Sequence, residues 1–197
     1  MYAVDEAIAA GADKVVITTD IAQIISGAKK RGVEVLVRPL DLALDATSME
    51  SVILHACKTL NLSGTIVLLQ PTSPLRRAKH IQMGLSMFAQ GHFDLVMSVT
   101  EANSTVLKWG FSDGAVFHPI SDPKYCFANR QQLPGLVRPN GAIYVFDAES
   151  FADREGFPVA RIGALRMTPE ESLDVDTLED FKRCEAALEM SEKVRQV

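Results

Sequence analysis

Short apolar runs alternate with amphipathic stretches over the first half of the chain. The apolar, β-branched runs predict strands at 15–17, 33–37, 65–69 and 95–99. They are mostly apolar on both faces, as parallel strands are when helices cover both sides of a sheet. Helical spacing occurs between them at 21–30, 49–60 and 79–90, and a glycine closely follows each stretch. This order predicts a doubly wound α/β sheet with right-handed crossovers.

The ends of several elements carry recognisable signals. Thr47, with Glu50 three residues later, predicts a capping box for the helix at 49–60. A further strand is expected at 141–146, and a last helix at 178–190 with Thr177 as its N-cap. The chain opens in a helical pattern at 2–10, where a nucleotide-binding α/β fold normally opens with a strand and a phosphate loop. Neither GxGxxG nor GxxxxGK[ST] occurs in the sequence.

The alternation stops after residue 101. From there to about residue 139 the sequence is rich in Gly, Pro, Asn and Asp and fits no strand-helix unit. A stretch this long and irregular is uncommon inside a compact domain, so it predicts a lid or a subunit-contact arm. We interpret 1–197 as one domain with this excursion at about 101–140.

Composition and charge narrow the classes of function. Hydrophobic residues make up 47% and charged residues 23% of the chain, which is typical of a globular protein. A net charge of -5 argues against a nucleic-acid partner, because phosphate backbones select basic surfaces. Three dispersed cysteines without a CxxC motif indicate free thiols in a reducing compartment. Because we find no signal-peptide pattern and no membrane-length apolar run, we expect a cytoplasmic protein without a membrane partner.

Two polar segments lie where an α/β sheet binds ligands, near the ends of strands. Residues 70–76 (Gln-Pro-Thr-Ser-Pro-Leu-Arg) gather an amide, two hydroxyls and a guanidinium on a turn that two prolines fix. This turn could equally be a rigid connection whose hydroxyls only cap the next helix. Arg130 and Arg138, the latter just before an Asn-Gly pair, suit bidentate recognition of a carboxylate or phosphate. Solvated loop arginines are the alternative.

Asp174 and Asp176 form the third candidate. In an extended segment these two carboxylates point to the same side and can offer two hard oxygen ligands to Mg²⁺, with substrate phosphates and water completing the octahedron. Alternatively they only stabilise the positive N-terminus of the helix that follows Thr177. The four histidines have no metal-ligand spacing.

These weak signals together form a specific pattern, because their order along the chain resembles the acylneuraminate cytidylyltransferase (CMP-N-acetylneuraminate synthetase) family. The resemblance runs from about Tyr2 into the last helix. It is carried by Arg38-Pro39 with Leu42-Ala43 and Asp45, by 69–76, 130–134 and 138–144 (Arg-Pro-Asn-Gly-Ala-Ile-Tyr), and by 172–176 (Ser-Leu-Asp-Val-Asp). It implies a Rossmann-like, three-layer αβα nucleotidyltransferase fold with a mostly parallel sheet, lacking the first strand and the phosphate loop.

The resemblance also implies a reaction and a set of site residues. CMP would pass from CTP to a sialic-acid-like nine-carbon sugar acid, in a homodimer held by the excursion. Asp174 and Asp176 would hold Mg²⁺, and Thr47 and Ser48 would approach the nucleotide. The residues expected around the sugar acid are Gln70, Arg130, Arg138, Asn140, Tyr144 and Phe157. Met49 departs from the family, which often has serine there.

The front of the chain is the largest departure from the family pattern. The sequence enters in the helix that follows the family's phosphate loop, so we expect very low CTP-dependent activity from residues 1–197 alone. A noncatalytic, dimeric sugar-acid-binding or regulatory relative is an alternative function. A Mg²⁺-dependent phosphohydrolase that uses Asp174 and Asp176 is a third.

Overall fold

Helices and strands alternate along the chain in the computed structural model, which describes residues 1–195 and the side chains of residues 1–190. The α-helices are α1 (Tyr2–Ala9), α2 (Ala22–Lys30), α3 (Met49–Leu60), α4 (Ala78–Ala89), α5 (Ala148–Arg154) and α6 (Leu178–Arg195). The strands are β1 (Val16–Thr19), β2 (Glu34–Val37), β3 (Thr65–Leu68), β4 (Leu95–Ala102), β5 (Gly110–Asp113), β6 (Val116–Pro119), β7 (Leu136–Asp147) and β8 (Ile162–Arg166). All the helices and strands predicted from the sequence form, with ends that shift by a few residues.

The main sheet has the strand order β3-β7-β4-β8. Strands β4 and β8 are parallel, whereas β7 runs antiparallel to both β3 and β4. The strands β3 and β4 therefore share one direction, as predicted, the additional strand β8 runs the same way, and β7 alone is reversed. The reason is that β7 returns alongside β4 instead of after a crossover helix. Strands β1 and β2 form a separate parallel pair.

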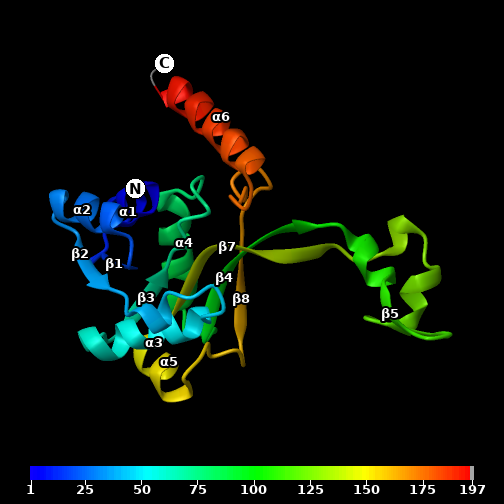
Figure 1. The fold of residues 1–197 in the computed structure, drawn as a ribbon. Coiled ribbons are helices and arrows are strands. Elements are labelled where there is room, and N and C mark those ends of the chain that lie inside the picture. Colours follow the sequence, from blue (N-terminus) through cyan, green and yellow to red (C-terminus); the bar gives the residue numbers. More distant parts are fainter. Residues whose placement is uncertain (196–197) are drawn as a thin grey trace.

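Helices cover both faces of the main sheet (Figure 1). Ile81 of α4 packs against Val96 and Val145 in one buried cluster. On the opposite face, Ile53 of α3 and Phe151 of α5 form a second buried cluster together with Phe146 and Leu95. The three-layer αβα fold expected from the sequence is therefore confirmed. Helices α1 and α2 pack in a third cluster with the β1-β2 pair.

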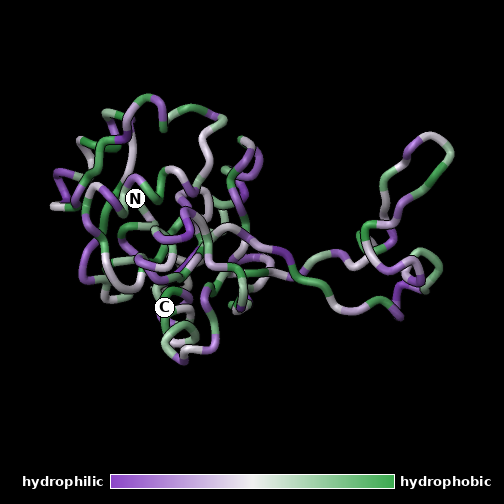
Figure 2. The backbone as a smooth tube through the Cα atoms, turned by 90° about the horizontal axis from the view of Figure 1, so that it is seen from below, coloured by the Kyte–Doolittle hydropathy of each residue, from purple (hydrophilic) through white to green (hydrophobic). Residues whose placement is uncertain are grey.

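An arm leaves this body along β4 and β7, which continue past the sheet as a two-stranded ribbon pairing Glu101 with Val137 and Ala102 with Leu136. The ribbon carries the β5-β6 hairpin and the short helices η2 (Ser104–Lys108), η3 (Pro123–Phe127) and η4 (Arg130–Gln132). The arm projects away from the body in both views (Figures 1 and 2). The predicted excursion is therefore an extended arm, and its hairpin was not anticipated.

Local signals of the sequence have mixed outcomes. Thr177 caps α6 as predicted, because its hydroxyl accepts from the Asp180 backbone N–H while the Asp180 carboxylate accepts from that of Thr177. The N-cap of α3 is Ser48, one residue after the predicted Thr47. All three cysteines are free thiols. Among the described residues, no helix is both long and apolar enough to cross a membrane.

Candidate functional site

The loop that follows β3 meets the segment that precedes α6. The backbone N–H of Val175 donates to the Thr72 carbonyl at 2.9 Å, and the Ser73 hydroxyl donates to Asp174 Oδ1 at 3.5 Å. Tyr144 comes from β7, opposite Leu68 of β3. Burial and the negative charge of Asp174 raise the pKa of Tyr144. Residues far apart in the sequence thus converge at the carboxyl end of β3.

Gln70 lies across a turn of β7 at this edge. Its Nε2 donates to the sulfur of Met49 at 3.2 Å. A Cβ atom on Gly141 would lie 2.5 Å from Gln70 Oε1, and Gly141 has a φ of +76°, which side-chain-bearing residues rarely adopt. A side chain at position 141 would therefore displace the Gln70 side chain. The Gln70 side chain is half-buried.

Asn140 precedes this turn and is only 4% exposed. Its Oδ1 accepts from the Ser98 hydroxyl and the Ala142 backbone N–H, and its Nδ2 donates to the Ser172 hydroxyl at 2.8 Å. The amide predicted to contact a sugar acid is therefore used inside the protein. Its observed bonds tie β7, β4 and the segment before Asp174 together.

An aromatic wall borders the same region. The ring centroids of Tyr144 and Phe157 are 5.5 Å apart, and Phe157 also contacts Phe146 and Phe151 edge to face. Tyr144, Phe157 and Met49 are partly buried against one cluster. Because Met49 contacts Gln70 and packs in this cluster, Gln70, Tyr144 and Phe157 lie on one side of the body.

The hydroxyls predicted to approach a nucleotide have local roles. Ser48 Oγ accepts from the Ser51 backbone N–H at 3.1 Å, which caps α3. Thr47 Oγ1 lies 3.3 Å from the Asp41 carbonyl oxygen, to which it donates. Ser48 stays exposed, and Thr47 is half-buried. Both lie at the start of α3, directly before Met49, whose sulfur contacts Gln70.

The two candidate arginines lie apart within one chain. Arg138 is exposed on β7, two residues before Asn140. Arg130 is exposed at the start of η4 in the arm, which projects away from the body (Figure 1). Among the described residues neither forms an ion pair, whereas Arg77 and Arg161 do. Both guanidinium groups are thus available to an anionic ligand, but one chain does not bring Arg130 to Gln70.

The two aspartates differ in exposure. Asp174 is half-buried beside Ser73, and Asp176 is exposed. Over the part of the chain that the structure describes, no cluster of three or more His, Cys, Asp or Glu side chains could hold a metal ion. Two carboxylates alone would leave a Mg²⁺ ion to take its remaining oxygen ligands from substrate phosphates and water.

Arg76, expected at the rim of the loop, is buried instead, with 1% of its surface exposed. Its Nη1 donates to the Gln70 carbonyl at 3.1 Å and to the Ala142 carbonyl at 2.6 Å. The one sequence feature that separates Arg76 from a solvated arginine is its position directly after Pro-Leu in a loop that prolines constrain.

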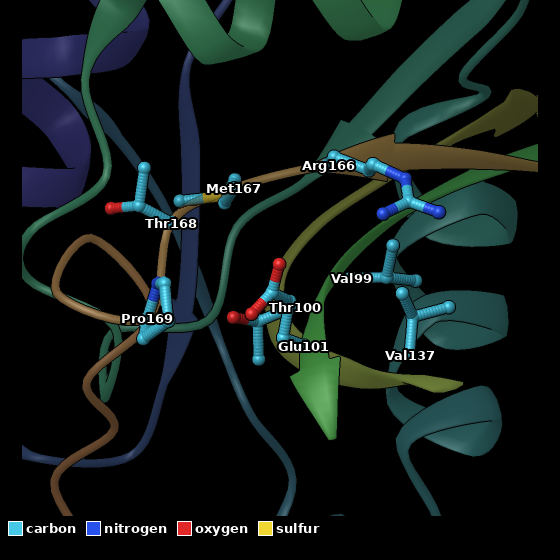
Figure 3. A pocket seen from close by; sticks show the side chains of 8 residues that line it. All are labelled: Val99, Thr100, Glu101, Val137, Arg166, Met167, Thr168 and Pro169. Carbon is cyan, nitrogen blue, oxygen red and sulfur yellow. The ribbon is translucent and has the colours of Figure 1, made fainter. Parts of the chain in front are cut away.

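A cavity of about 240 Å³ lies on another part of the sheet edge, by the ends of β4 and β8. Figure 3 shows Arg166, Val99 and Val137 on one side of it and Thr168 and Pro169 on the other. None of the residues predicted to bind substrate lines this cavity. We therefore place the candidate site at the Gln70 edge.

A polar cluster packs behind the Gln70 loop, at the start of α4. His80 is buried, its Nδ1 accepts from the Arg77 backbone N–H at 3.1 Å, and its Nε2 lies 3.2 Å from Glu171 Oε1. Glu6 of α1 accepts from the Ala78 backbone N–H and pairs with Arg77. Burial lowers the pKa of His80, and the Glu171 carboxylate opposes this only in part.

This lowered pKa predicts a pH dependence of stability. In the unfolded chain, His80 takes up a proton near its ordinary pKa of about 6.5, whereas burial opposes this protonation in the folded chain. The unfolded state therefore binds more protons than the folded state as the pH falls. Stability should be full above about pH 6.5 and decline below it. Urea unfolding at about pH 7.5 and about pH 5.5 measures the difference in the free energy of unfolding between the two pH values. His80→Gln should reduce this difference. An equal pH difference in both proteins would contradict the assignment.

Comparisons with known proteins show which proteins this chain is similar to. A family model described as cytidylyltransferase matches residues 1–186. The chain is 30% identical over 160 residues to an N-acylneuraminate cytidylyltransferase of Streptococcus agalactiae serotype V, covering 77% of this chain and 37% of that protein. It is 31% identical over 171 residues to the enzyme of that name from Escherichia coli O18:K1:H7, covering 86% and 41%. The chain thus spans about two fifths of the length of these relatives.

Solved structures share the fold. A CMP:2-keto-3-deoxy-manno-octonic acid synthetase complexed with CTP matches with a TM-score of 0.65 and 13% identity, over 98% of this chain and 85% of that one. A 4-diphosphocytidyl-2C-methyl-D-erythritol synthase from Anaerococcus prevotii matches with a TM-score of 0.64 and 14% identity, over 95% and 84%. Identities this low support the shared nucleotidyltransferase fold alone.

Proposed function

The chain belongs to the cytidylyltransferase family, and we propose that it carries the acceptor site of an enzyme that transfers CMP from CTP to a sialic-acid-like nine-carbon sugar acid. The observation that carries this proposal is the convergence of Gln70, Tyr144 and Asp174 at the carboxyl end of β3. Ligands of open α/β sheets bind at this end of the strands. The relatives named N-acylneuraminate cytidylyltransferase support the acceptor class.

The residues of this edge suit a polar acid with an apolar substituent. Arg138 lacks a protein carboxylate partner among the described residues and can take the acceptor carboxylate in a bidentate contact. Gln70 can hydrogen-bond hydroxyls, and the wall of Tyr144 and Phe157 can take an apolar group. Binding would orient the acceptor hydroxyl for in-line attack on the α-phosphorus of CTP.

Asp174 and Asp176 would hold Mg²⁺ in this reaction. When bound, the ion supplies charge neutralisation for the triphosphate and the developing pyrophosphate. The half-buried Asp174 is kept in place by the Ser73 hydroxyl and by its position next to the Val175–Thr72 backbone bond. The chain's own contribution is therefore to hold two carboxylates beside the acceptor.

Calorimetry tests the acceptor site, and pyrophosphate release tests the reaction. We expect N-acetylneuraminic acid to bind residues 1–197, because the acceptor residues form one edge of the body. Pyrophosphate release requires CTP and Mg²⁺ in addition, and we expect it to be impaired for this polypeptide alone. No binding of N-acetylneuraminic acid, or of related nine-carbon acids, would contradict the proposed acceptor. Phosphate release without any sugar acid would instead favour a phosphohydrolase.

We also propose that two copies of the chain associate through the arm. Residues 109–127 expose several large apolar side chains, and Phe127 is 90% exposed. The arm's exposed apolar residues include Trp109, Phe111, Val116, Phe117, Ile120 and Phe127. An element that stands away from the body with this much apolar surface is a strong candidate for an interface. A second copy's arm would also bring an Arg130 to the acceptor edge.

Replacing Phe111 and Phe127 with serine should convert the dimer to a monomer. Each phenylalanine removed from an apolar interface costs about 1.5–3 kcal/mol of association, or roughly 10- to 150-fold in the dimer dissociation constant. Sedimentation velocity measures the change. The control is Ile8→Ser, which removes a comparably exposed apolar side chain from α1 on the body. A wild-type chain that stays monomeric at micromolar concentration would contradict the dimer.

A further inference from the structure

Arg76 is a buried cation without an ion pair. Only 1% of its surface is exposed, and no carboxylate lies within salt-bridge distance of it among the described residues. Its Nε is buried and has no hydrogen-bond partner there. Burial lowers the pKa of the guanidinium to about 10, although the charge of Glu6 opposes this. The group remains a cation at neutral pH.

A buried charge without a counterion is costly, so its contacts must compensate. These contacts are two carbonyl oxygens. One belongs to Gln70, at the start of the segment that follows β3, and the other to Ala142, in β7. The two carbonyls flank the contact between the Gln70 side chain and Gly141. One guanidinium nitrogen therefore joins the two backbone segments whose separation sets the position of the Gln70 amide.

We propose that Arg76 is a positioning residue for the acceptor site, which holds Gln70 over Gly141 by joining the carbonyls of Gln70 and Ala142. The proposal rests on the proposed function only in assigning Gln70 to the sugar acid. Arg76 itself does not touch the ligand, because it is buried beneath the loop. Its effect on binding must therefore pass through Gln70.

A double-mutant cycle on N-acetylneuraminic acid binding tests this dependence. Losing the two carbonyl contacts in Arg76→Met should weaken binding about 3- to 10-fold, and Gln70→Ala should weaken it by a similar factor. The double variant should bind no more weakly than the weaker single variant. Arg76→Lys keeps the charge and an ammonium donor, and should restore part of the affinity. Independent, additive losses would overturn the proposal.

A readout on Gln70 itself separates positioning from general destabilisation. The side-chain amide of Gln70 gives its own ¹⁵N resonances, and we expect these to shift and broaden in Arg76→Met and to shift less in Arg76→Lys. The matched control is Arg77→Met, which removes the neighbouring arginine of the same loop, a residue that pairs with Glu6. It should lower the melting temperature without moving these resonances.

The two readouts also keep the proposals apart. If wild type binds no sugar acid while the Gln70 resonances move in Arg76→Met, the proposed function fails and the positioning role stands. If the acid binds but the Gln70 resonances stay unchanged in the Arg76 variants, the positioning role is wrong. Should Arg76→Met not fold, Arg76→Lys carries both measurements, because an ammonium group does not reproduce the geometry of the guanidinium contacts. Gln70 resonances and sugar-acid affinity that are both identical to wild type in Arg76→Lys would then overturn the role.

Discussion

Replacing Arg138 with alanine should weaken binding of N-acetylneuraminic acid by roughly 10- to 150-fold. A charge-assisted contact to a carboxylate contributes about 1.5–3 kcal/mol, and every 1.4 kcal/mol is about a factor of ten in affinity. Arg138 is exposed and has no ion-pair partner among the described residues, so the ligand does not have to displace a protein carboxylate. Isothermal titration calorimetry measures the change directly.

Arg166→Ala is the control for this prediction. Arg166 is also exposed, but it lines the separate cavity at the ends of β4 and β8 (Figure 3). Its removal should leave the affinity within about 2-fold of wild type, as expected for a charge outside the site. A loss confined to Arg166→Ala would move the acid to that cavity and would contradict the assignment of Arg138.

The place of Arg130 can be tested by mixing variants. If each site takes Arg138 from one chain and Arg130 from the arm of the other, a mixed dimer of Arg130→Ala and Arg138→Ala chains contains one site with both arginines and one with neither. One of the two sites in each mixed dimer should then regain wild-type affinity, which is about a quarter of all sites after equimolar mixing and free exchange. If both arginines serve the same chain, every site in the mixed dimer lacks one of them and no affinity returns.

The layout of the body could be predicted because burial imposes a simple pattern on it. Strands β3 and β4 are covered by helices on both faces, so both of their faces must be apolar, and this pattern is visible in the sequence. The helix ends before Gly32 and Gly91 could also be recognised, because both glycines have positive φ, whereas α3 ends at Asn61, which takes the left-handed conformation with a φ of +45°. The apolar strand faces and the glycines that follow helices are local features, so they can be recognised in the sequence.

The reversal of β7 and the presence of β8 could not be predicted in this way. Strand β7 is antiparallel because it pairs with β4 along the arm ribbon, and such a long-range pairing leaves no local signal. Strand β8 alternates exposed and buried residues at the edge of the sheet, with only Gly163 and Leu165 buried. Its five residues are too few to separate from a loop by periodicity.

For the candidate site, the sequence predicted the residue types that occur there but could not predict the role of each residue. The sequence identified Gln70, Asn140 and Asp174 as polar residues at one edge, and the structure brings their segments together. It could not reveal that the Asn140 amide is used entirely within the protein, or that Arg76 is buried. In the sequence, an asparagine or arginine that binds a ligand cannot be told from one that bonds a backbone carbonyl. Only the tertiary contacts distinguish the two roles.

Placing a family-type strand and Gly-rich loop before Met1 should raise CTP-dependent pyrophosphate release by at least about 10²–10³-fold over residues 1–197, because each preorganised backbone donor to a developing anion contributes on that order. The polypeptide has a net charge of -5, which repels a triphosphate, and its sequence contains no phosphate-loop motif. Within the described residues, β1 pairs only with β2, and β3 pairs only with β7. Each therefore has one free edge that an added strand could occupy.

Two controls separate the loop from the strand in this experiment. The same strand followed by a Ser-Ala linker should stabilise the sheet but leave pyrophosphate release low, because it lacks the close backbone approach that glycines permit. Asp174→Asn in the extended protein should remove most of the gained activity, since Mg²⁺ then keeps only one of its two protein carboxylates. Rapid turnover by residues 1–197 without any addition would contradict the prediction. It would mean that the chain, or a second copy of it, supplies the phosphate-binding groups from another segment.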